Sequence, residues 1–298
     1  MKVLNFGSLN VDYVYQVDHM VAPGETLAAG SRNIFCGGKG LNQSIGLAKA
    51  GAPVYHAGMI GEGGDILLDM LKENQVNTEF VRKTDGPCGH TVIQVDKNGQ
   101  NSILLFGGSN RTITKEFVDE VLSSFGKEDY LVLQNEINEL AYIIDKAYEA
   151  GMTIVLNPSP YDDNLKECDL SKVSIFLINE VEGFQISGEK EAEKILGKMQ
   201  KDYPDAAVVL TLGGEGSVYR KGDKTCHQGI YKVKAVDTTA AGDTFTGFFL
   251  TALIEQKSAE EALDLAAKAS AIAVTRPGAA GSIPVRAEVE AWKGTDNH

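Results

Sequence analysis

The stretch "AVDTTAAGDTFTGFFLTALIEQ", residues 235–256, joins a turn of small residues to a long apolar run. The large apolar residues of this run recur at helical spacing on one face: Phe245, Phe248, Phe249, Ala252 and Leu253. The spacing predicts a helix that begins near Ala241, Gly242 and Asp243. Small residues at a helix start expose N–H groups at the positive end of the helix dipole, which favours an anion such as a phosphoryl group. Asp243 is then either a helix cap or a base beside an anion site, and this stretch leaves both interpretations open.

A second stretch, "CGGKGLNQS" from Cys36 to Ser44, places Lys39 inside a glycine run at the head of another expected helix. A phosphate-binding loop of the common NTPase type requires a glycine five positions before Gly-Lys and a Ser or Thr directly after the lysine. The chain has Asn33 and Gly40 at these positions, so the pattern is not met. The run is therefore either a structural turn or a place where the backbone approaches another ligand.

The rest of the chain predicts the fold class. Short β-branched or apolar runs recur along it: "KVLNFGS" (2–8), "YLVLQ" (130–134), "TIVLN" (153–157), "IFLIN" (175–179) and "AVVLTLG" (207–213). Segments with helical spacing lie between them, which indicates right-handed βαβ units and a doubly wound α/β fold with a mostly parallel central sheet flanked by helices. Residues 11–35 and 88–107 have β character without a helix, with a hairpin expected around Asn98-Gly99, and are predicted to form a small separate sheet. We expect one domain over residues 1–298.

Composition narrows the function classes. The 41 acidic and 28 basic residues give a net charge of −13, which disfavours nucleic acid and anionic membrane partners and favours a small-molecule ligand. The four cysteines form no Cys-x-x-Cys pair, so neither a zinc site nor a disulfide framework is indicated. The N-terminal apolar run is too short for a signal peptide, and no run of about 18 apolar residues occurs. We expect a cytoplasmic protein.

Two further motifs are ambiguous by themselves. In "LTLGGEGSVY" (210–219) a strand runs into three glycines, but no glycine run completes the dinucleotide fingerprint G-x-G-x-x-G, and a plain turn is the default interpretation. Asn179 to Glu182 follow a strand end, where α/β sheets place ligand-binding groups, although acidic residues are also common at helix starts.

Taken together, these motifs resemble the ribokinase family of carbohydrate kinases from Gly7 to Pro284. Both signatures of that family have counterparts, "GGKGLNQS" (37–44) and "DTTAAGDTFTG" (237–247). Further matching stretches are "GSLNVD" (7–12), "PGET" (23–26), "QNE" (134–136), "TLGGEG" (211–216) and "AIAVTRPGAAGSIP" (271–284). One departure is Phe248, where the second signature usually has a small residue.

The resemblance implies an ATP-dependent kinase that transfers the γ-phosphoryl group to the primary (O5) hydroxyl of D-ribose and gives ribose 5-phosphate. Asp243 is implied as the catalytic base, with an anion hole formed by the N–H groups of Ala240, Ala241 and Gly242. The implied sugar-binding residues are Asn10, Asp12, Gly38, Lys39, Gly40, Asn42, Glu136 and Asp243. The implied ATP-binding residues are Asn179, Thr211, Gly213, Gly214, Gly216 and Gly242.

The resemblance also implies two metal ions. Glu182 would act on Mg²⁺ through water, and a monovalent cation, K⁺, would lie beside the anion hole. The matching cation residues are Asp237, Thr239, Ala273, Arg276, Gly278 and Ser282, with Arg276 contributing its backbone because its side chain is cationic. Segments 11–35 and 88–107 would form a lid over the sugar and pair two subunits into a homodimer.

Two alternatives stay open at this stage. One is a kinase of the same family that acts on 2-deoxyribose, another sugar or a nucleoside. The other is a sugar-sensing protein without turnover, against which Asp243 argues because binding alone requires no base.

Overall fold

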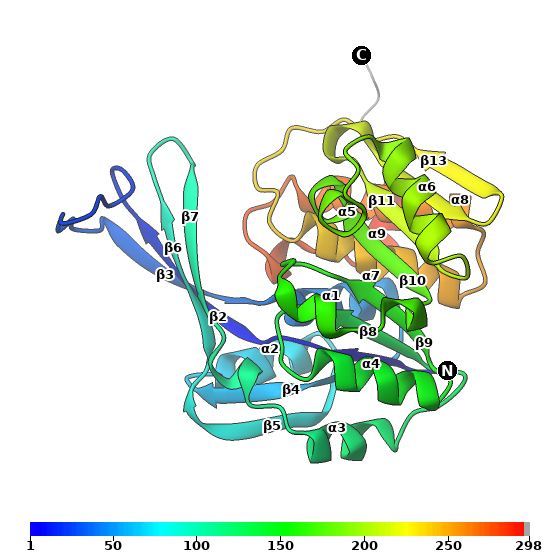
Figure 1. The fold of residues 1–298 in the computed structure, drawn as a ribbon. Helices are drawn as coiled ribbons and strands as arrows, with labels where there is room; N and C mark the ends of the chain where they lie inside the picture. The colour runs from blue at the N-terminus through cyan, green and yellow to red at the C-terminus, as the bar shows by residue number, and fades with distance from the viewer. Residues whose placement is uncertain (295–298) are drawn as a thin grey trace.

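The computed structural model describes residues 1–294, and within them the main sheet has nine strands in the order β13-β12-β11-β10-β9-β8-β1-β4-β5 (Figure 1). The strands are β1 Val3–Phe6, β4 Val54–Glu62, β5 Asn77–Pro87, β8 Tyr130–Gln134, β9 Thr153–Asn157, β10 Ile175–Asn179, β11 Ala207–Thr211, β12 Ser217–Lys221 and β13 Lys224–Gln228. Every neighbouring pair from β5 to β11 is parallel, and β12 and β13 add an antiparallel edge. The predicted mostly parallel sheet is confirmed; the last four residues of the predicted domain lie outside the described residues.

Helices cover both faces of this sheet. They are α1 Lys39–Ala50, α2 Asp65–Glu73, α3 Lys115–Leu122, α4 Leu140–Glu149, α5 Glu180–Ser187, α6 Ala192–Asp202, α7 Ala241–Ile254, α8 Ala259–Ala273 and α9 Arg286–Ala291. Helices α1, α2, α7, α8 and α9 share one buried core with alternate strand residues such as Val3 and Val132. Helices α3, α4 and α6 share the other with Leu4 and Leu131. The alternation follows the period of two of a strand and gives the predicted doubly wound arrangement.

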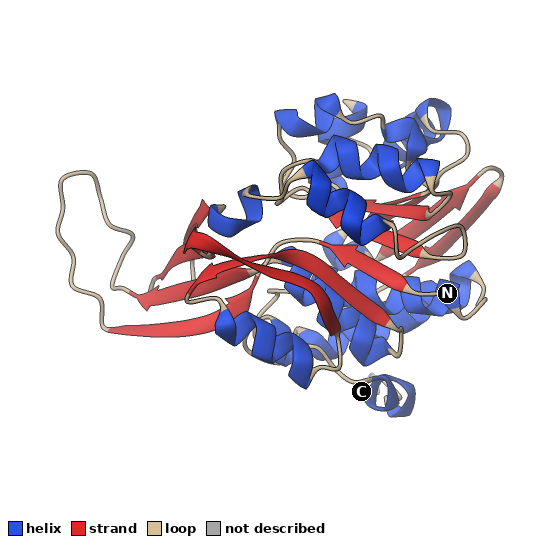
Figure 2. Ribbon diagram, turned by 90° about the horizontal axis from the view of Figure 1, so that it is seen from below, coloured by secondary structure: helices blue, strands red, loops and turns tan. Residues whose placement is uncertain are grey.

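A second sheet of four strands projects to one side of the main body (Figure 1). Its order is β3 Ser31–Gly37, β2 Asn10–Gln16, β6 Gly89–Val95 and β7 Asn101–Phe106, with β2 and β6 parallel and the outer pairs antiparallel. Gly99 has φ +77 in the turn between β6 and β7, which confirms the predicted hairpin. Segment 11–35 was predicted to have β character, but strands occupy only its two ends. Residues 17–30 between them contain no strand and form the long loop seen beyond the sheet in Figure 2.

Helix α7 begins at Ala241, as the small-residue turn predicts. The sequence predicted that one apolar face of α7 is buried, but every residue from Asp243 to Ala252 is buried. The reason is tertiary: α7 packs between α1 and α8. A Cβ atom on Gly247 would lie 2.4 Å from the backbone carbon of Gly46, so α1 and α7 cross with their backbones in contact. Phe248, which departs from the family signature, is fully buried in this core.

Within residues 1–294, none of the helices has the length and apolar character needed to cross a lipid bilayer.

Candidate active site

The start of α7 is an uncapped helix terminus. Ala240 is the N-cap residue in a left-handed conformation with φ +59, and no side chain caps the helix. The carboxylate of Asp243 instead accepts hydrogen bonds from Asn42 Nδ2 at 3.1 Å and from Gln43 Nε2 at 3.0 Å. The geometry therefore argues against the capping interpretation of Asp243, whose side chain is buried at 7% exposure. Of the predicted anion-hole donors, Ala241 gives its N–H to Thr238 O at 3.2 Å.

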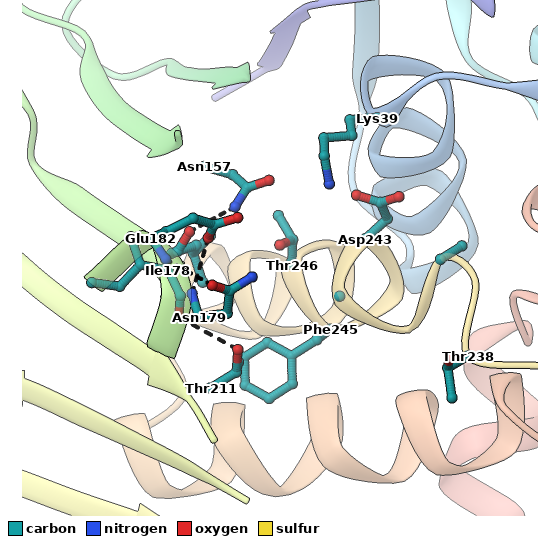
Figure 3. Close-up of a pocket in the computed structure, with 13 residues that line it drawn as sticks. Lys39, Asn157, Ile178, Asn179, Glu182, Thr211, Thr238, Asp243, Phe245 and Thr246 are labelled. Atoms are coloured by element: carbon teal, nitrogen blue, oxygen red, sulfur yellow. Dashed lines mark hydrogen bonds between the residues drawn. The ribbon is translucent and has the colours of Figure 1, made fainter. Parts of the chain in front are cut away.

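A cavity of about 260 Å³ lies at this helix start. Lys39 and Asp243 lie on one side of it, and Asn157, Asn179 and Glu182 lie opposite (Figure 3). Burial acts to lower the pKa of Lys39. Three carboxylates outweigh burial and hold that pKa above its ordinary value, namely those of Asp243, Glu136 and Glu182. Lys39 is therefore a half-buried cation stabilised by the surrounding carboxylates.

A larger cavity of about 900 Å³ shares Asn179, Thr211, Thr238, Gly242 and Phe245 with the first. All the predicted ATP-binding residues line it: Asn179, Thr211, Gly213, Gly214, Gly216 and Gly242. Much of its remaining wall is apolar, from Ile230, Tyr231, Val233, Ala235, Phe245, Ala271 and Val274. The two adjoining cavities have a polar end at Asp243 and a largely apolar part beyond it, which suits a ligand with one polar and one apolar end.

The glycine turn of the larger cavity is both a structural turn and a cavity wall. It forms a short 3-10 helix, Gly213–Glu215, between β11 and β12. Gly216 has φ +100, and a Cβ there would lie 2.0 Å from Gln228 O, so only glycine fits. At Gly213 and Gly214 an added Cβ would meet nothing within 4 Å, so open space lies beside the turn. Because these two residues have no side chains, that space is left to a ligand.

Asn179 and Glu182 form a capping box at the start of α5. Asn179 Oδ1 accepts from Glu182 N at 2.9 Å, and Glu182 Oε2 accepts from Asn179 N at 3.0 Å. The structural interpretation of this motif is thus confirmed, and both side chains also line the smaller cavity. Glu182 is 5% exposed, and only its Oε2 atom is used in the box.

The glycines at the start of α1 each have a conformational or packing role. Gly38, the N-cap of α1, has φ +93. A Cβ on Gly40 would lie 2.4 Å from the backbone nitrogen of Ser8, so the helix start is pressed against the link between β1 and β2. Glu136 Oε2 accepts hydrogen bonds from Lys39 N at 3.0 Å and from Ser8 Oγ. Glu136 therefore lies at the N-terminus of α1, beside the predicted sugar residues.

Asp12 lies where β2 enters the small sheet. Its Oδ1 accepts a hydrogen bond from Thr91 Oγ1 at 2.5 Å. Burial raises the pKa of Asp12 to about 6, with the Thr91 hydrogen bond opposing and the charge of Glu136 adding to the rise. A Cβ on Gly37 would lie 1.9 Å from Asp12 Oδ2, so the glycine is required for the carboxylate to fit.

Asn10 completes this group, and its Oδ1 accepts from Asn110 Nδ2 at 2.7 Å. Neither cavity is lined by Asn10, Asp12 or Glu136, so the predicted sugar residues divide into two sets. Lys39 and Asp243 line the smaller cavity, and Asn42 donates a hydrogen bond to Asp243. The others, Asn10, Asp12, Gly38, Gly40 and Glu136, lie around the base of the small sheet and the start of α1. Thr91, Asn110 and Gln43 each hold a predicted site residue but were not themselves predicted. Gln43 is inside the first signature, whereas no local pattern marks the other two.

The two segments predicted to hold a monovalent cation lie side by side. Asp237 Oδ2 accepts from Gly278 N at 2.9 Å, and Asp237 Oδ1 accepts from Thr239 N at 2.9 Å and Thr239 Oγ1 at 2.6 Å. Burial acts to raise the pKa of Asp237, but these hydrogen bonds outweigh it and lower the pKa. The guanidinium of Arg276 forms an ion pair with Glu288, so only the backbone of Arg276 is available to a cation.

Comparisons with known proteins agree with this geometry. The family described as "pfkB family carbohydrate kinase" matches residues 1–286, and the chain belongs to this family of phosphotransferases. A ribokinase of Staphylococcus aureus (strain COL) is 36% identical, covering 97% of this chain and 98% of the relative. The structure of a Thermotoga maritima ribokinase has a TM-score of 0.88 at 34% identity, with 98% of each chain covered. An Arabidopsis thaliana ribokinase complexed with ribose and ATP has a TM-score of 0.87 at 31% identity, with 97% of each chain covered.

Proposed function

We propose that this enzyme transfers the γ-phosphoryl group of ATP to the O5 hydroxyl of D-ribose and releases ribose 5-phosphate and ADP. The observation that carries the proposal is the buried carboxylate of Asp243 at an uncapped helix start, at the polar end of the two joined cavities. The Arabidopsis ribokinase, which binds ribose and ATP, supports the choice of substrates because its fold and length match this chain.

In this mechanism Asp243 accepts the O5 proton as the hydroxyl oxygen attacks the γ-phosphorus. The bond from that phosphorus to the bridging oxygen of ADP breaks, and negative charge spreads over the transferring group. The N–H groups of Ala240 and Gly242 stabilise that charge in this proposal. The N–H group of Ala241 does so too once its hydrogen bond to Thr238 O is broken. Lys39 adds positive charge from the same cavity. Lys39 is a sugar-binding residue in this proposal, and it lines the same cavity as Asp243.

The nucleotide occupies the larger cavity in this proposal, with its base against apolar lining residues such as Tyr231 and Phe245 and its phosphates toward Gly242. Mg²⁺ fits beside it because Glu182 offers a buried carboxylate with one oxygen outside the capping box. When bound, Mg²⁺ neutralises phosphate charge. The role of Glu182 is to orient water toward that ion.

A monovalent cation fits the segments around Asp237 and Gly278. The hydrogen bond from Gly278 N to Asp237 Oδ2 holds these segments together, with the Asp237 carboxylate between them, next to the turn that leads into α7. The residues that would hold the ion are Asp237, Thr239, Ala273, Arg276, Gly278 and Ser282. Such an ion stabilises the turn, whose residue Ala240 has an unfavourable left-handed conformation.

The small sheet acts as a lid over the sugar, because Asp12 and Asn10 lie at its base. Its outer strands β3 and β7 carry exposed apolar side chains: Ile34, Phe35, Ile103, Leu104, Leu105 and Phe106. Exposed apolar edge strands are unfavourable in water and favour pairing with another surface. We infer that a second copy of the chain covers them and forms a homodimer.

Asp243→Asn should keep the affinity for ATP and sugar and lower kcat by at least about 100-fold, because the amide cannot accept the O5 proton. Steady-state kinetics and ligand titration measure the two effects. A variant with wild-type kcat would remove Asp243 as the base. Sugar binding by a wild-type protein that turns over no pentose, hexose or nucleoside would favour the sensor alternative.

The enzyme should have a higher kcat/KM for ribose than for 2-deoxyribose, with Asp12 contributing to the difference. A site that hydrogen-bonds several hydroxyls leaves polar groups unpaired when the deoxy sugar binds, and each unpaired group costs about 1–3 kcal/mol. The ionised carboxylate accepts hydrogen bonds, so the KM for ribose should rise as the pH falls through about 6, where Asp12 becomes protonated.

Asp12→Asn is the matched variant, since its amide does not titrate. It should raise the ribose KM at pH 8, reduce the preference for ribose and flatten the pH dependence of KM between pH 5 and pH 8. A preference of the wild type for 2-deoxyribose would reject ribose as the substrate, and an unchanged pH profile in Asp12→Asn would remove Asp12 from the sugar site.

Replacing a bulky organic cation by K⁺ at constant ionic strength should increase kcat, because an ordered turn keeps the anion-hole N–H groups in place. Asp237→Asn should weaken the response by removing the charge between the two segments. Equal rates in both salts would reject the cation site and leave the kinase assignment unaffected.

Leu104→Lys should shift the protein from dimer to monomer without unfolding it, because Leu104 is 71% exposed in the single chain. Sedimentation velocity and circular dichroism measure the two properties. Val285→Lys, at a residue 51% exposed on the main body, is the control and should stay dimeric. A wild-type protein that is monomeric at all concentrations contradicts the proposed dimer.

A further inference from the structure

Buried side-chain amides form a network behind Asp243. Gln43, on α1, donates from Nε2 to Asp243 Oδ1 at 3.0 Å and to Asn157 Oδ1 at 3.2 Å. Its own Oε1 accepts from Gln134 Nε2 at 2.7 Å. Gln43 and Gln134 are both fully buried, and neither lines the two cavities. Gln43 thus contacts the proposed base without lining either cavity.

The orientation of the Gln43 amide is fixed by its neighbours. Asn157 Nδ2 donates to the backbone carbonyl of Leu177 at 2.8 Å, so Asn157 presents its oxygen to Gln43. Rotating the Gln43 amide by half a turn would place its oxygen against the oxygens of Asn157 and Asp243. The same rotation would place its NH₂ group against the NH₂ group of Gln134. Only the observed orientation pairs each donor with an acceptor.

Gln134 is fixed in the same way from its other side. Its Nε2 also donates to Asn5 Oδ1 at 3.0 Å, and Asn5 Nδ2 donates to Gly40 O at 2.8 Å and to Ser44 Oγ at 2.9 Å. A backbone carbonyl can only accept, so Asn5 cannot rotate, and Gln134 must point its NH₂ toward Asn5 and Gln43. Its Oε1 is left without a hydrogen-bond partner among the described residues, an unfavourable state that the two donated bonds offset.

We propose that Gln43 is the positioning residue for Asp243, and that Gln134 and Asn5 act through it by fixing its amide orientation. Gln43 holds Oδ1 of the carboxylate while Asn42 holds Oδ2, which sets the carboxylate plane before the sugar binds. The proposal rests on the proposed function, in which Asp243 takes the O5 proton. Gln43 lines neither cavity, so its effect is on the geometry of proton transfer.

Gln43→Met keeps the size and removes the amide. We expect kcat to fall about 10- to 100-fold, with the KM values for ATP and ribose within about twofold of wild type, because orientation of the base is lost and binding is retained. Thr251→Val is the control: it removes a buried hydrogen bond of α7, the helix that carries Asp243, from Thr251 Oγ1 to Gly247 O at 2.8 Å. It should lower Tm and leave kcat unchanged.

Gln134→Met tests the network from a residue that touches neither Asp243 nor the cavities, and it keeps the proposal testable if Gln43→Met does not fold. It should lower kcat by a smaller factor at unchanged KM. In the double variant it should lower kcat no further than Gln43→Met does alone, since it acts through Gln43.

The Asp243→Asn variant separates the two proposals. If Asp243→Asn loses kcat while Gln43→Met keeps the wild-type value, only the positioning role is overturned. The positioning role is also overturned if the losses in kcat of Gln43→Met and Gln134→Met multiply in the double variant. A rise in KM without a change in kcat in Gln43→Met overturns it as well. A wild-type kcat in Asp243→Asn overturns the proposed base itself.

Discussion

The backbone contact between α1 and α7 is the constraint on which the site depends. Helices usually pack 8–10 Å apart because side chains separate them, and glycine at the crossing removes that separation. An added Cβ on Gly247 would lie 2.4 Å from Gly46, and one on Gly46 would lie 3.1 Å from the carbonyl oxygen of Asp243. The crossing therefore brings Asn42 and Gln43 of the first signature within hydrogen-bond distance of Asp243 in the second.

The arrangement of charges in the site follows from that helix crossing. It buries Asp243 beside Lys39, and burying a lone carboxylate would be costly, so the lysine and the two amide donors are needed to compensate. The same cavity leaves the start of α7 without a side-chain cap. An uncapped helix start leaves N–H groups at the positive end of the helix dipole, an environment that favours an anion.

Local patterns in the sequence predicted much of this arrangement. The start of α7, the β6–β7 hairpin and the parallel strands follow from residue spacing, glycine positions and β-branched runs, which act within a few residues. Contacts between distant segments did not follow. Gln43 and Asp243 are 200 positions apart, and Thr91 reaches Asp12 only because β2 and β6 pair in parallel. The burial of α7 on all sides likewise depends on its packing between α1 and α8, which no periodicity within α7 reveals.

The glycine run 37–40 shows how one motif meets three unrelated demands. Gly37 leaves space for the Asp12 carboxylate, Gly38 takes a left-handed conformation, and Gly40 allows α1 to press against Ser8. None of these demands involves a phosphate, which explains why the run fails the pattern of a phosphate-binding loop. Lys39 is the one side chain in the run, and the turn directs it into the cavity at Asp243. The glycines thus shape the junction between the small sheet and α1, and Lys39 brings a positive charge to the cavity.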